Sequence, residues 1–134
     1  MKLHLDTNIF LEILLAQDQA EESQILLKNT HHHELFLTDY SLHSIGLLLF
    51  RKGQHQTFEL FLRDLAGLSL LSLSIDDTAE VATAATQFHL DFDDAYQYVT
   101  AKKHHLTIVS FDHDFDKTDR GRKTPREILS DSIL

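Results

Sequence analysis

The chain has 134 residues, of which 43% are hydrophobic, so it is long enough to bury one core and too short for a second, and residues 1–134 are expected to form a single domain. It has no cysteine, no N-terminal signal segment and no apolar run long enough to cross a bilayer, which predicts a soluble, cytoplasmic protein without disulfides, thiolate metal sites or a membrane partner. The net charge of −9 lowers the expectation of a nucleic-acid partner but does not remove it, because basic residues gather in the C-terminal part: Lys102, Lys103, Lys117, Arg120, Arg122, Lys123 and Arg126.

The first half of the chain predicts two strands, each followed by helical segments. Residues 3–5 predict a short buried strand, which is followed by a helix from Asn8 to about Ala16 and by a second helical segment over residues 17–28. Residues 34–37 predict the second strand. Thr38 and Asp39 then supply an N-cap region for a largely buried helix over residues 40–51, and Gly53 is expected to end that helix.

The second half continues the alternation. The next helix is predicted from the spacing of one apolar face, made of Phe58, Phe61, Leu62 and Leu65. Residues 68–74 predict a strand, and Asp76 and Asp77 are expected to cap a helix with the inner face Ala79, Ala82, Ala85 and Phe88. Residues 91–105 predict a helix, residues 106–111 a strand, and Pro125 the start of a last helical turn. The alternation of strands and helices predicts an α/β fold, in which helices cover both faces of a parallel sheet.

Acidic residues gather where ligands bind in such folds, beyond the carboxyl ends of the strands. Asp6 follows the first predicted strand, and Asp93 and Asp94 begin the helix that leads into the last one. The last strand is followed by Asp112, Asp114 and Asp116. Each acid also has a purely structural explanation, as a helix cap or turn former for Asp6, as helix caps for Asp91 and Asp93, and as a solvated loop for residues 112–116.

The combination of these acids points to a metal site. Carboxylates that lie close together repel one another and raise one another's pKa values, and a divalent cation removes that repulsion. Mg²⁺ and Mn²⁺ prefer oxygen ligands, and a site with one or two such ions can activate a water molecule and neutralise a phosphate group during its transfer. The acids therefore predict a metal site that acts on a phosphate ester.

Three segments, LDTNIFLEIL, DFDDAYQYVTAKKHHLTIVSFDHDFD and TPREIL, resemble the PIN domain, and above all the small VapC-type toxins of bacterial toxin–antitoxin pairs. The resemblance covers essentially the whole chain in the right order. It implies a three-layer α/β/α sandwich with a mainly parallel central sheet. It also implies a Mg²⁺- or Mn²⁺-dependent ribonuclease that is held in check by an antitoxin, and a homodimer.

The resemblance assigns roles to individual residues. The catalytic acids, which would hold the metal and its activated water, are Asp6, Asp94 and Asp112, and Asp114 matches an additional metal ligand. The supporting polar residues of the pocket are matched by Thr7, Asn8 and Ser110. Asp93 and Asp116 match none of these positions and are expected to be bystanders, although either acid could serve through a water molecule.

One position departs from the family pattern. PIN nucleases usually carry a Glu on the helix after the second strand, and Ser44, or His43 beside it, stands there in this sequence. The main alternative is therefore a weak or inactive PIN-like module that binds RNA or protein. A receiver-type phosphate-handling domain is a further alternative, for which Asp39 would be a poor phosphate acceptor. The expected surfaces are residues 45–50 and 58–65 for a second copy, and for RNA the basic residues Lys102, Lys103, Arg120 and Arg122.

Overall fold

Four short strands form a parallel sheet in the order β3-β2-β1-β4 within residues 1–133, which the computed structural model describes. The strands are β1 (Lys2–Leu5), β2 (Glu34–Thr38), β3 (Ser69–Leu71) and β4 (Thr107–Val109). The apolar side chains of β1 and its neighbours are buried on both faces, as parallel strands between two helical layers require. Leu134, the C-terminal limit of the predicted domain, lies outside the described residues.

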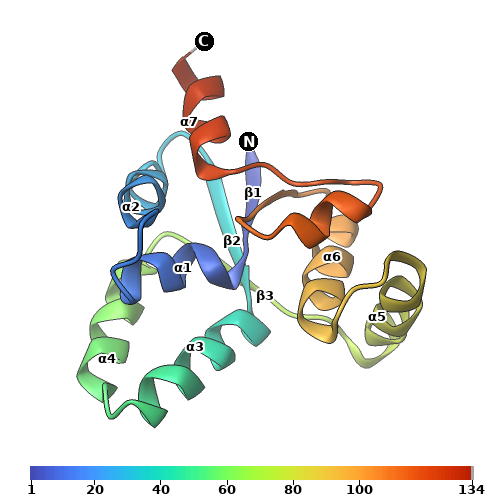
Figure 1. The fold of residues 1–134 in the computed structure, drawn as a ribbon, viewed down its shortest axis with the longest axis horizontal. Helices are drawn as coiled ribbons and strands as arrows, with labels where there is room; N and C mark the ends of the chain where they lie inside the picture. The colour runs from blue at the N-terminus through green and yellow to red at the C-terminus, as the bar shows by residue number, and fades with distance from the viewer. Residues whose placement is uncertain (134) are drawn as a thin grey trace.

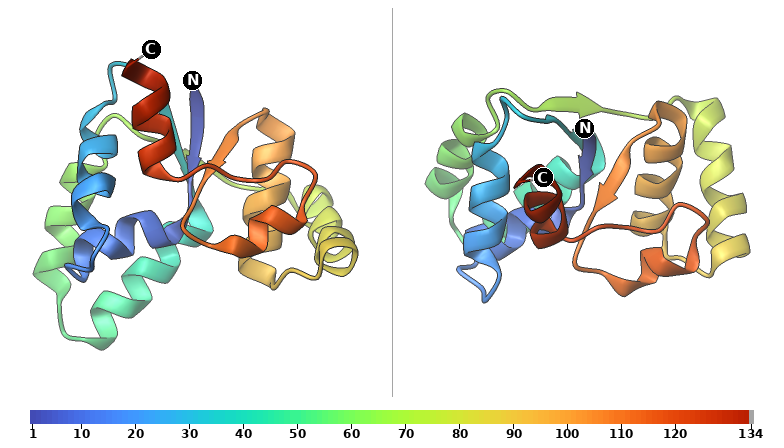
Figure 2. Two further views of the ribbon diagram at one scale, coloured as in Figure 1. Left: turned by 45° about the horizontal axis from the view of Figure 1, so that its top comes forward. Right: turned by 90° about the horizontal axis from the view of Figure 1, so that it is seen from above.

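Helices cover both faces of this sheet, so the molecule has three layers (Figures 1 and 2). One face carries α1 (Thr7–Leu14), α2 (Ala20–Lys28), α3 (Asp39–Arg51), α4 (His55–Asp64) and α7 (Pro125–Ile133). The other face carries α5 (Ile75–Phe88) and α6 (Phe92–His104), and a short 3₁₀ helix, η1 (His113–Lys117), follows β4. This architecture confirms the predicted α/β/α sandwich with a parallel central sheet. Over the described residues, no helix combines the length and the apolar character needed to cross a membrane.

Apolar cores on the two faces hold the sheet between its helical layers. The core under α1 to α4 contains Leu3, Leu5, Phe10 and Leu49, all fully buried. The rings of Phe10 and Phe61 meet edge to face there, with centroids 5.6 Å apart. Burying each such side chain contributes roughly 1.5–3 kcal/mol to the stability of the fold. This packing holds the strands in place and therefore sets the position of their carboxyl ends.

The boundaries of several elements differ from the predictions. The segment predicted to be helical from residue 17 forms α2 only from Ala20 onward, because residues 17–19 make a turn. The strands predicted over residues 68–74 and 106–111 shorten to β3 and β4. Thr38 is confirmed as the N-cap of α3, since its hydroxyl accepts a hydrogen bond of 3.0 Å from the backbone N–H of Ser41.

The prediction for α5 was wrong at its start and on its inner face. The helix begins at Ile75, and its N-cap is Ser74, whose hydroxyl accepts from the backbone N–H of Asp77 at 3.1 Å. The buried residues of α5 are Val81 and Ala84, with Ala85 and Phe88 half-buried. Ala79 and Ala82 are exposed, because the side of the helix that meets α6 is centred on Val81 and Ala84.

Candidate active site

Five carboxylates gather beyond the carboxyl ends of β1 and β4, where these neighbouring parallel strands bring Asp6 and Asp112 to one edge. The first turn of α6 adds Asp93 and Asp94. The acids form two groups, and within each group the carboxylate oxygens lie within 4.8 Å of one another. The first group is Asp6, Asp93 and Asp94, and the second is Asp94, Asp112 and Asp114. Asp94 belongs to both groups, so it is the centre of the cluster.

Asp6 does not cap the helix that follows it. It stands at the N-cap position of α1 in an extended conformation, but its side chain makes no capping hydrogen bond. Its carboxylate is buried and faces other elements instead: Oδ2 accepts from the hydroxyl of Ser110 at 2.6 Å, and Oδ1 accepts from the amide of Gln97 at 2.7 Å. The prediction that Asp6 caps the helix is therefore wrong, and its carboxylate is instead bonded to β4 and α6 residues.

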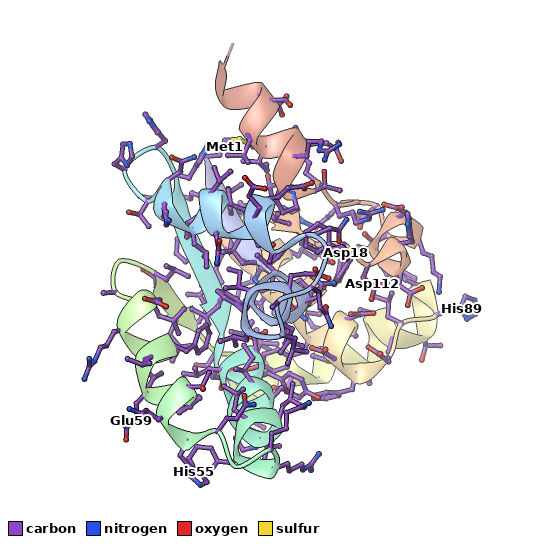
Figure 3. The ribbon with its side chains drawn as sticks, turned by 60° about the vertical axis from the view of Figure 1, so that its left-hand side comes forward. Met1, Asp18, His55, Glu59, His89 and Asp112 are labelled. Carbon is purple, nitrogen blue, oxygen red and sulfur yellow. The ribbon has the colours of Figure 1, made fainter. Side chains whose placement is uncertain are left out.

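Ser110, at the end of β4, connects the two strand ends. Its hydroxyl donates to Asp6 and accepts from the backbone N–H of Asp112 at 2.9 Å and from Nδ2 of Asn8 at 3.3 Å. The carboxylate of Asp112 in turn accepts from the backbone N–H of Asp114 at 2.8 Å. The carboxylate of Asp6 and the backbone N–H of Asp112, which Figure 3 labels, are thus bonded to one hydroxyl group.

A hydroxyl of α3 that connects to the site belongs to Ser41. The hydroxyl of Thr7, next to Asp6, donates to the Ser41 hydroxyl at 2.8 Å, and that hydroxyl also accepts from Thr38 at 3.1 Å. Ser41 is fully buried, whereas Ser44 is half-buried on α3 and His43 is exposed. Thr7 therefore connects the acid site to α3 through a residue that the sequence did not single out.

Gln97 and His4 form a buried series of hydrogen bonds to the first acid group, and neither residue was predicted to have a role. The Gln97 amide Nε2 donates to Oδ1 of Asp6 at 2.7 Å and to Oδ1 of Asp93 at 2.9 Å. Its Oε1 lies 2.9 Å from Nε2 of His4, which is fully buried. Burial lowers the pKa of His4 to about 4, so its ring is neutral near pH 7 and Nε2–H is the donor to Gln97.

Two patterns in the sequence could have identified this series of hydrogen bonds. Gln97 follows Asp93 by four residues, which puts the two side chains on one face of α6. His4 precedes Asp6 by two residues on and just after a strand, which puts both on one side of it, and a polar residue within a buried strand needs a partner. Asp93 was expected to be a bystander, but it accepts a hydrogen bond from Gln97 and belongs to the first acid group.

Burial, together with the nearby charges of other acids, raises the pKa values of Asp6, Asp93 and Asp94. Burial, followed by the nearby charge of Asp112, raises the pKa of Asp94 from its ordinary value of 3.8 to about 8. Burial raises the pKa of Asp6 to about 6, although the hydrogen bonds from Ser110 and Gln97 act in the opposite direction. Burial also raises the pKa of Asp93. A cluster of only oxygen donors whose negative charges destabilise one another fits a hard divalent cation.

The basic residues expected to flank the site are mostly placed elsewhere. Lys102 and Lys103 lie in the last turn of α6, at the opposite end from Asp94, and Lys103 pairs with Asp77 on α5. Arg120 donates to the backbone oxygen of Leu106 at 2.9 Å. Of the four, Arg122 approaches the site: it donates to the backbone oxygen of Ser110 at 3.1 Å and pairs with Asp116 at 3.2 Å. The prediction that Lys102 and Lys103 flank the acid site is therefore wrong.

In the metal-free protein, the free energy of unfolding is expected to fall as the pH rises from about 6.5 to 8. Folded Asp94 keeps its proton up to a pKa of about 8, whereas in the unfolded chain it ionises near its ordinary value of 3.8, so the folded state binds more protons in this range. Below pH 6.5 His4 has the opposite effect, because its folded pKa of about 4 lies below its ordinary value of 6.5. Urea unfolding at both pH values with a chelator measures the change. A flat or rising stability would contradict it, and Asp94→Asn should remove the fall.

Comparisons with known proteins agree with this architecture. Residues 3–121 match the PIN domain. A toxin–antitoxin complex from Klebsiella pneumoniae has a TM-score of 0.72 at 19% identity, over 92% of this chain and 97% of that one. VapBC2 from Rickettsia felis, bound to a DNA fragment from its promoter, has a TM-score of 0.73 at 16% identity, over 92% and 97%. VapC20 from Mycobacterium tuberculosis, a toxin that cleaves the sarcin–ricin loop, has a TM-score of 0.69 at 14% identity, over 85% and 92%.

At these identities the solved structures establish a shared fold, and among curated proteins none matches the sequence. The sequence match covers most of the chain, from the first strand to the loop after η1. It leaves the receiver-type alternative without support. The chain belongs to the PIN domain family.

Proposed function

We propose that the protein is a metal-dependent endoribonuclease that hydrolyses RNA phosphodiesters, and that it is the toxin of a type II toxin–antitoxin pair. The observation that carries the proposal is the pair of acid groups that share Asp94. The proposed ligands of Mg²⁺ or Mn²⁺ are Asp6, Asp94, Asp112 and Asp114. When bound, such an ion activates water and neutralises charge on the phosphate. The test is cleavage of single-stranded RNA by the purified protein with and without added ion.

The residues of the chain prepare this site in two ways. Ser110 and Gln97 each hold one oxygen of Asp6, so the carboxylate cannot rotate, and donors of this kind around metal ligands set their orientation. Arg122 donates to the backbone oxygen of Ser110 and pairs with Asp116, an acid that belongs to neither group. Because Asp94 holds its proton up to about pH 8 without a cation, binding of the ion releases that proton. Ion affinity should therefore rise with pH.

A weak or inactive binding module is the second candidate, because Ser44 replaces the usual Glu of the family. Asp93 favours the active enzyme over this candidate. Its carboxylate lies with Asp6 and Asp94 within one group, held by Gln97, so the first group keeps three acids although α3 contributes none to either group. Asp93 thus supplies a carboxylate to a site in which Ser44 is expected to replace the Glu of the family.

Asp93→Asn is expected to weaken Mn²⁺ binding about 10-fold or more, because it removes a charged oxygen from the first acid group. Asp116→Asn is the matched control, since Asp116 belongs to neither group. Calorimetric titration of Mn²⁺ into the two variants and the wild type measures the change. Equal affinity in all three proteins would make Asp93 the bystander that the sequence suggested.

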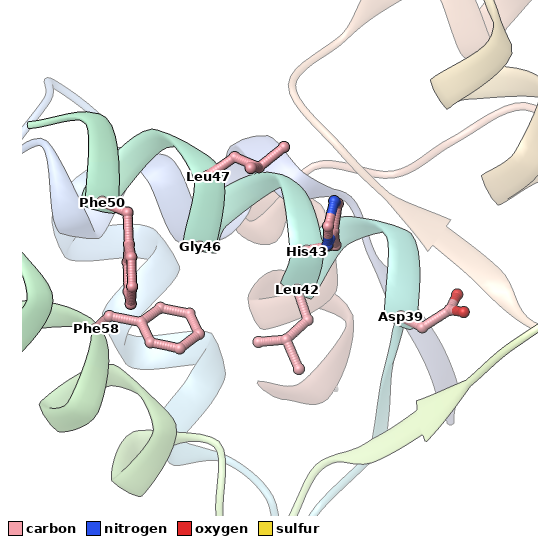
Figure 4. A pocket seen from close by; sticks show the side chains of 7 residues that line it. All are labelled: Asp39, Leu42, His43, Gly46, Leu47, Phe50 and Phe58. Carbon is pink, nitrogen blue, oxygen red and sulfur yellow. The ribbon is translucent and has the colours of Figure 1, made fainter.

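An apolar pocket between α3 and α4 is the proposed docking site of the antitoxin. It has a volume of about 420 Å³, and Figure 4 shows Leu42 and Phe58 pointing into it. Gly46 lets the ring of Phe58 pack closely on α3, because a Cβ atom there would lie 3.3 Å from that ring. Asp39 forms the polar end of the pocket and lies two residues before Ser41, which is bonded to Thr7 beside Asp6. An antitoxin chain lying in the pocket would therefore end near the carboxylates. The structural neighbours that are toxin–antitoxin complexes support this occupant.

Phe50→Glu is expected to prevent co-purification with the product of a small neighbouring gene while leaving RNA cleavage unchanged. Phe50 lines the pocket and is 50% exposed, so a charge there opposes an apolar partner, and it lies on α3 away from the acids. Leu70→Glu is the control, because Leu70 is 53% exposed on β3 and lies outside the pocket. An unimpaired complex with Phe50→Glu would contradict the docking site.

Leu60 and Leu62, exposed on α4 outside the pocket, remain the expected surface for a second copy.

A further inference from the structure

Three aromatic rings from two helices meet beside the acid site. The ring centroids of Tyr40 and Phe92 lie 5.5 Å apart, those of Tyr40 and Tyr96 lie 5.7 Å apart, and those of Phe92 and Tyr96 lie 6.0 Å apart. With Asp39 and His43, these rings line an open pocket of about 380 Å³. Tyr96 is buried, Tyr40 is half-buried, and Phe92 is 51% exposed. The buried ring therefore supports two rings that face the solvent.

The aromatic pocket adjoins the carboxylates through both helices. Phe92 directly precedes Asp93 and Asp94 in the first turn of α6. Tyr40 directly precedes Ser41, whose hydroxyl bonds the residue after Asp6. On α6, Phe92 of the pocket is therefore next to an acid of the site. On α3, Tyr40 is next to the residue that connects to Asp6 through Thr7. A chain whose phosphate reaches the acids would bring its neighbouring nucleotide to these rings.

The pocket also offers a fixed hydrogen-bond acceptor. Oδ1 of Asp39 accepts from the hydroxyl of Tyr96 at 2.9 Å and from the backbone N–H of Tyr40 at 2.8 Å. These two bonds hold the carboxylate and leave its Oδ2 to accept from a ligand. A negative charge at this place disfavours a phosphate, whereas it favours an amino group on a flat, uncharged ring.

We propose that this pocket binds a base of single-stranded RNA next to the cleaved phosphodiester, with the base stacked on Phe92 and Tyr40 and its amino group bonded to Asp39. The inference rests on the proposed nuclease function and adds a subsite to it. Unpaired bases stack on exposed aromatic side chains, and a carboxylate accepts from the exocyclic amino group of cytosine. The subsite therefore favours unpaired RNA and a base that carries an amino group.

The test uses ligands that an endonuclease cannot cleave: cytidine 5′-monophosphate, uridine 5′-monophosphate and ribose 5-phosphate, each titrated in Mg²⁺. NMR follows the ring protons of Tyr40 and Phe92. Cytidine monophosphate should shift these signals, whereas ribose 5-phosphate, which has the phosphate but no base, should not. Phe92→Ala should weaken nucleotide binding at least about fivefold, and Phe92→Tyr should retain it. Phe50→Ala is the matched control, because Phe50 is equally exposed but lines the other pocket.

The proposed hydrogen bond to Asp39 is tested by comparing the binding of two nucleotides. Cytidine and uridine monophosphates differ at the ring position that carries an amino group in one and an oxygen in the other, so cytidine should bind more tightly and Asp39→Asn should reduce the difference. Equal shifts with ribose 5-phosphate, or unchanged binding by Phe92→Ala, would overturn the base subsite. Nucleotide binding without any RNA cleavage would contradict the nuclease and leave the subsite intact. RNA cleavage with unmoved ring signals would contradict the subsite alone.

Discussion

Asp94→Asn is expected to stabilise the metal-free protein and to weaken Mn²⁺ binding at least about 100-fold. The carboxyl group of Asp94 is buried among Asp6, Asp93, Asp112 and Asp114, and its pKa of about 8 shows how strongly the fold disfavours its charge. A neutral amide of the same size removes that electrostatic cost, which corresponds to a gain of at most about 5 kcal/mol near pH 8. It also removes the one oxygen donor that both acid groups share, which is why the effect on the ion is large.

Urea unfolding with a chelator and calorimetric titration with Mn²⁺ measure the two effects on the same samples. Asp76→Asn is the control, since Asp76 is an exposed acid in the first turn of α5 and belongs to neither group. A variant that is less stable than the wild type would show that the acids do not repel one another. A variant with wild-type affinity would show that Asp94 is not the shared ligand.

Gln97→Met is expected to lower both stability and ion affinity. The substitution keeps the size of the side chain but removes the amide that bonds Asp6, Asp93 and His4. The N–H of His4 is then buried without a partner, which costs about 1–3 kcal/mol. Asp6 and Asp93 also lose the donor that orients them, and loss of such a donor typically weakens metal binding 10- to 100-fold.

The double variant His4→Phe/Gln97→Met separates the two roles of Gln97. Replacing both members of the buried pair leaves no orphaned donor on His4, so its stability should be higher than the sum of the two single effects predicts. Its ion affinity should stay low, because Asp6 and Asp93 remain without the amide. Wild-type ion affinity in Gln97→Met would show that the amide does not position these acids.

The fold was predictable because its signals are local and repeated. The apolar strands, the N-cap at Thr38 and the alternation of elements all appear within short windows of sequence, and they were confirmed. The inner face of α5 was not, because alanines alone mark a helical stripe poorly, and Val81 determines which side is buried. Segment lengths at β3 and β4 depend on pairing with neighbouring strands, which no local window contains.

The site was only partly predictable for a similar reason. The sequence placed Asp6, Asp94 and Asp112 at strand and helix ends, and the fold brings them together around Asp94. The spacing of Asp93 and Gln97 on α6 is visible in the sequence, but the hydrogen bond from Gln97 to Asp6 joins residues 91 positions apart, which no local pattern predicts. The sequence could not tell Ser41 from Ser44 either, since only the packing of α1 on α3 decides which hydroxyl meets Thr7.

The central claim is that the acids at the sheet edge form a metal-dependent ribonuclease site, and cleavage of an end-labelled, mixed-sequence, single-stranded RNA tests it most directly. Purified wild-type protein and Asp94→Asn are incubated in parallel with Mn²⁺, with Mg²⁺ and with a chelator. Wild-type protein should cleave the RNA only in the presence of an ion, and Asp94→Asn should leave it intact in all three conditions. Cleavage by Asp94→Asn at the wild-type rate, or cleavage by the wild type in the chelator, would contradict the account.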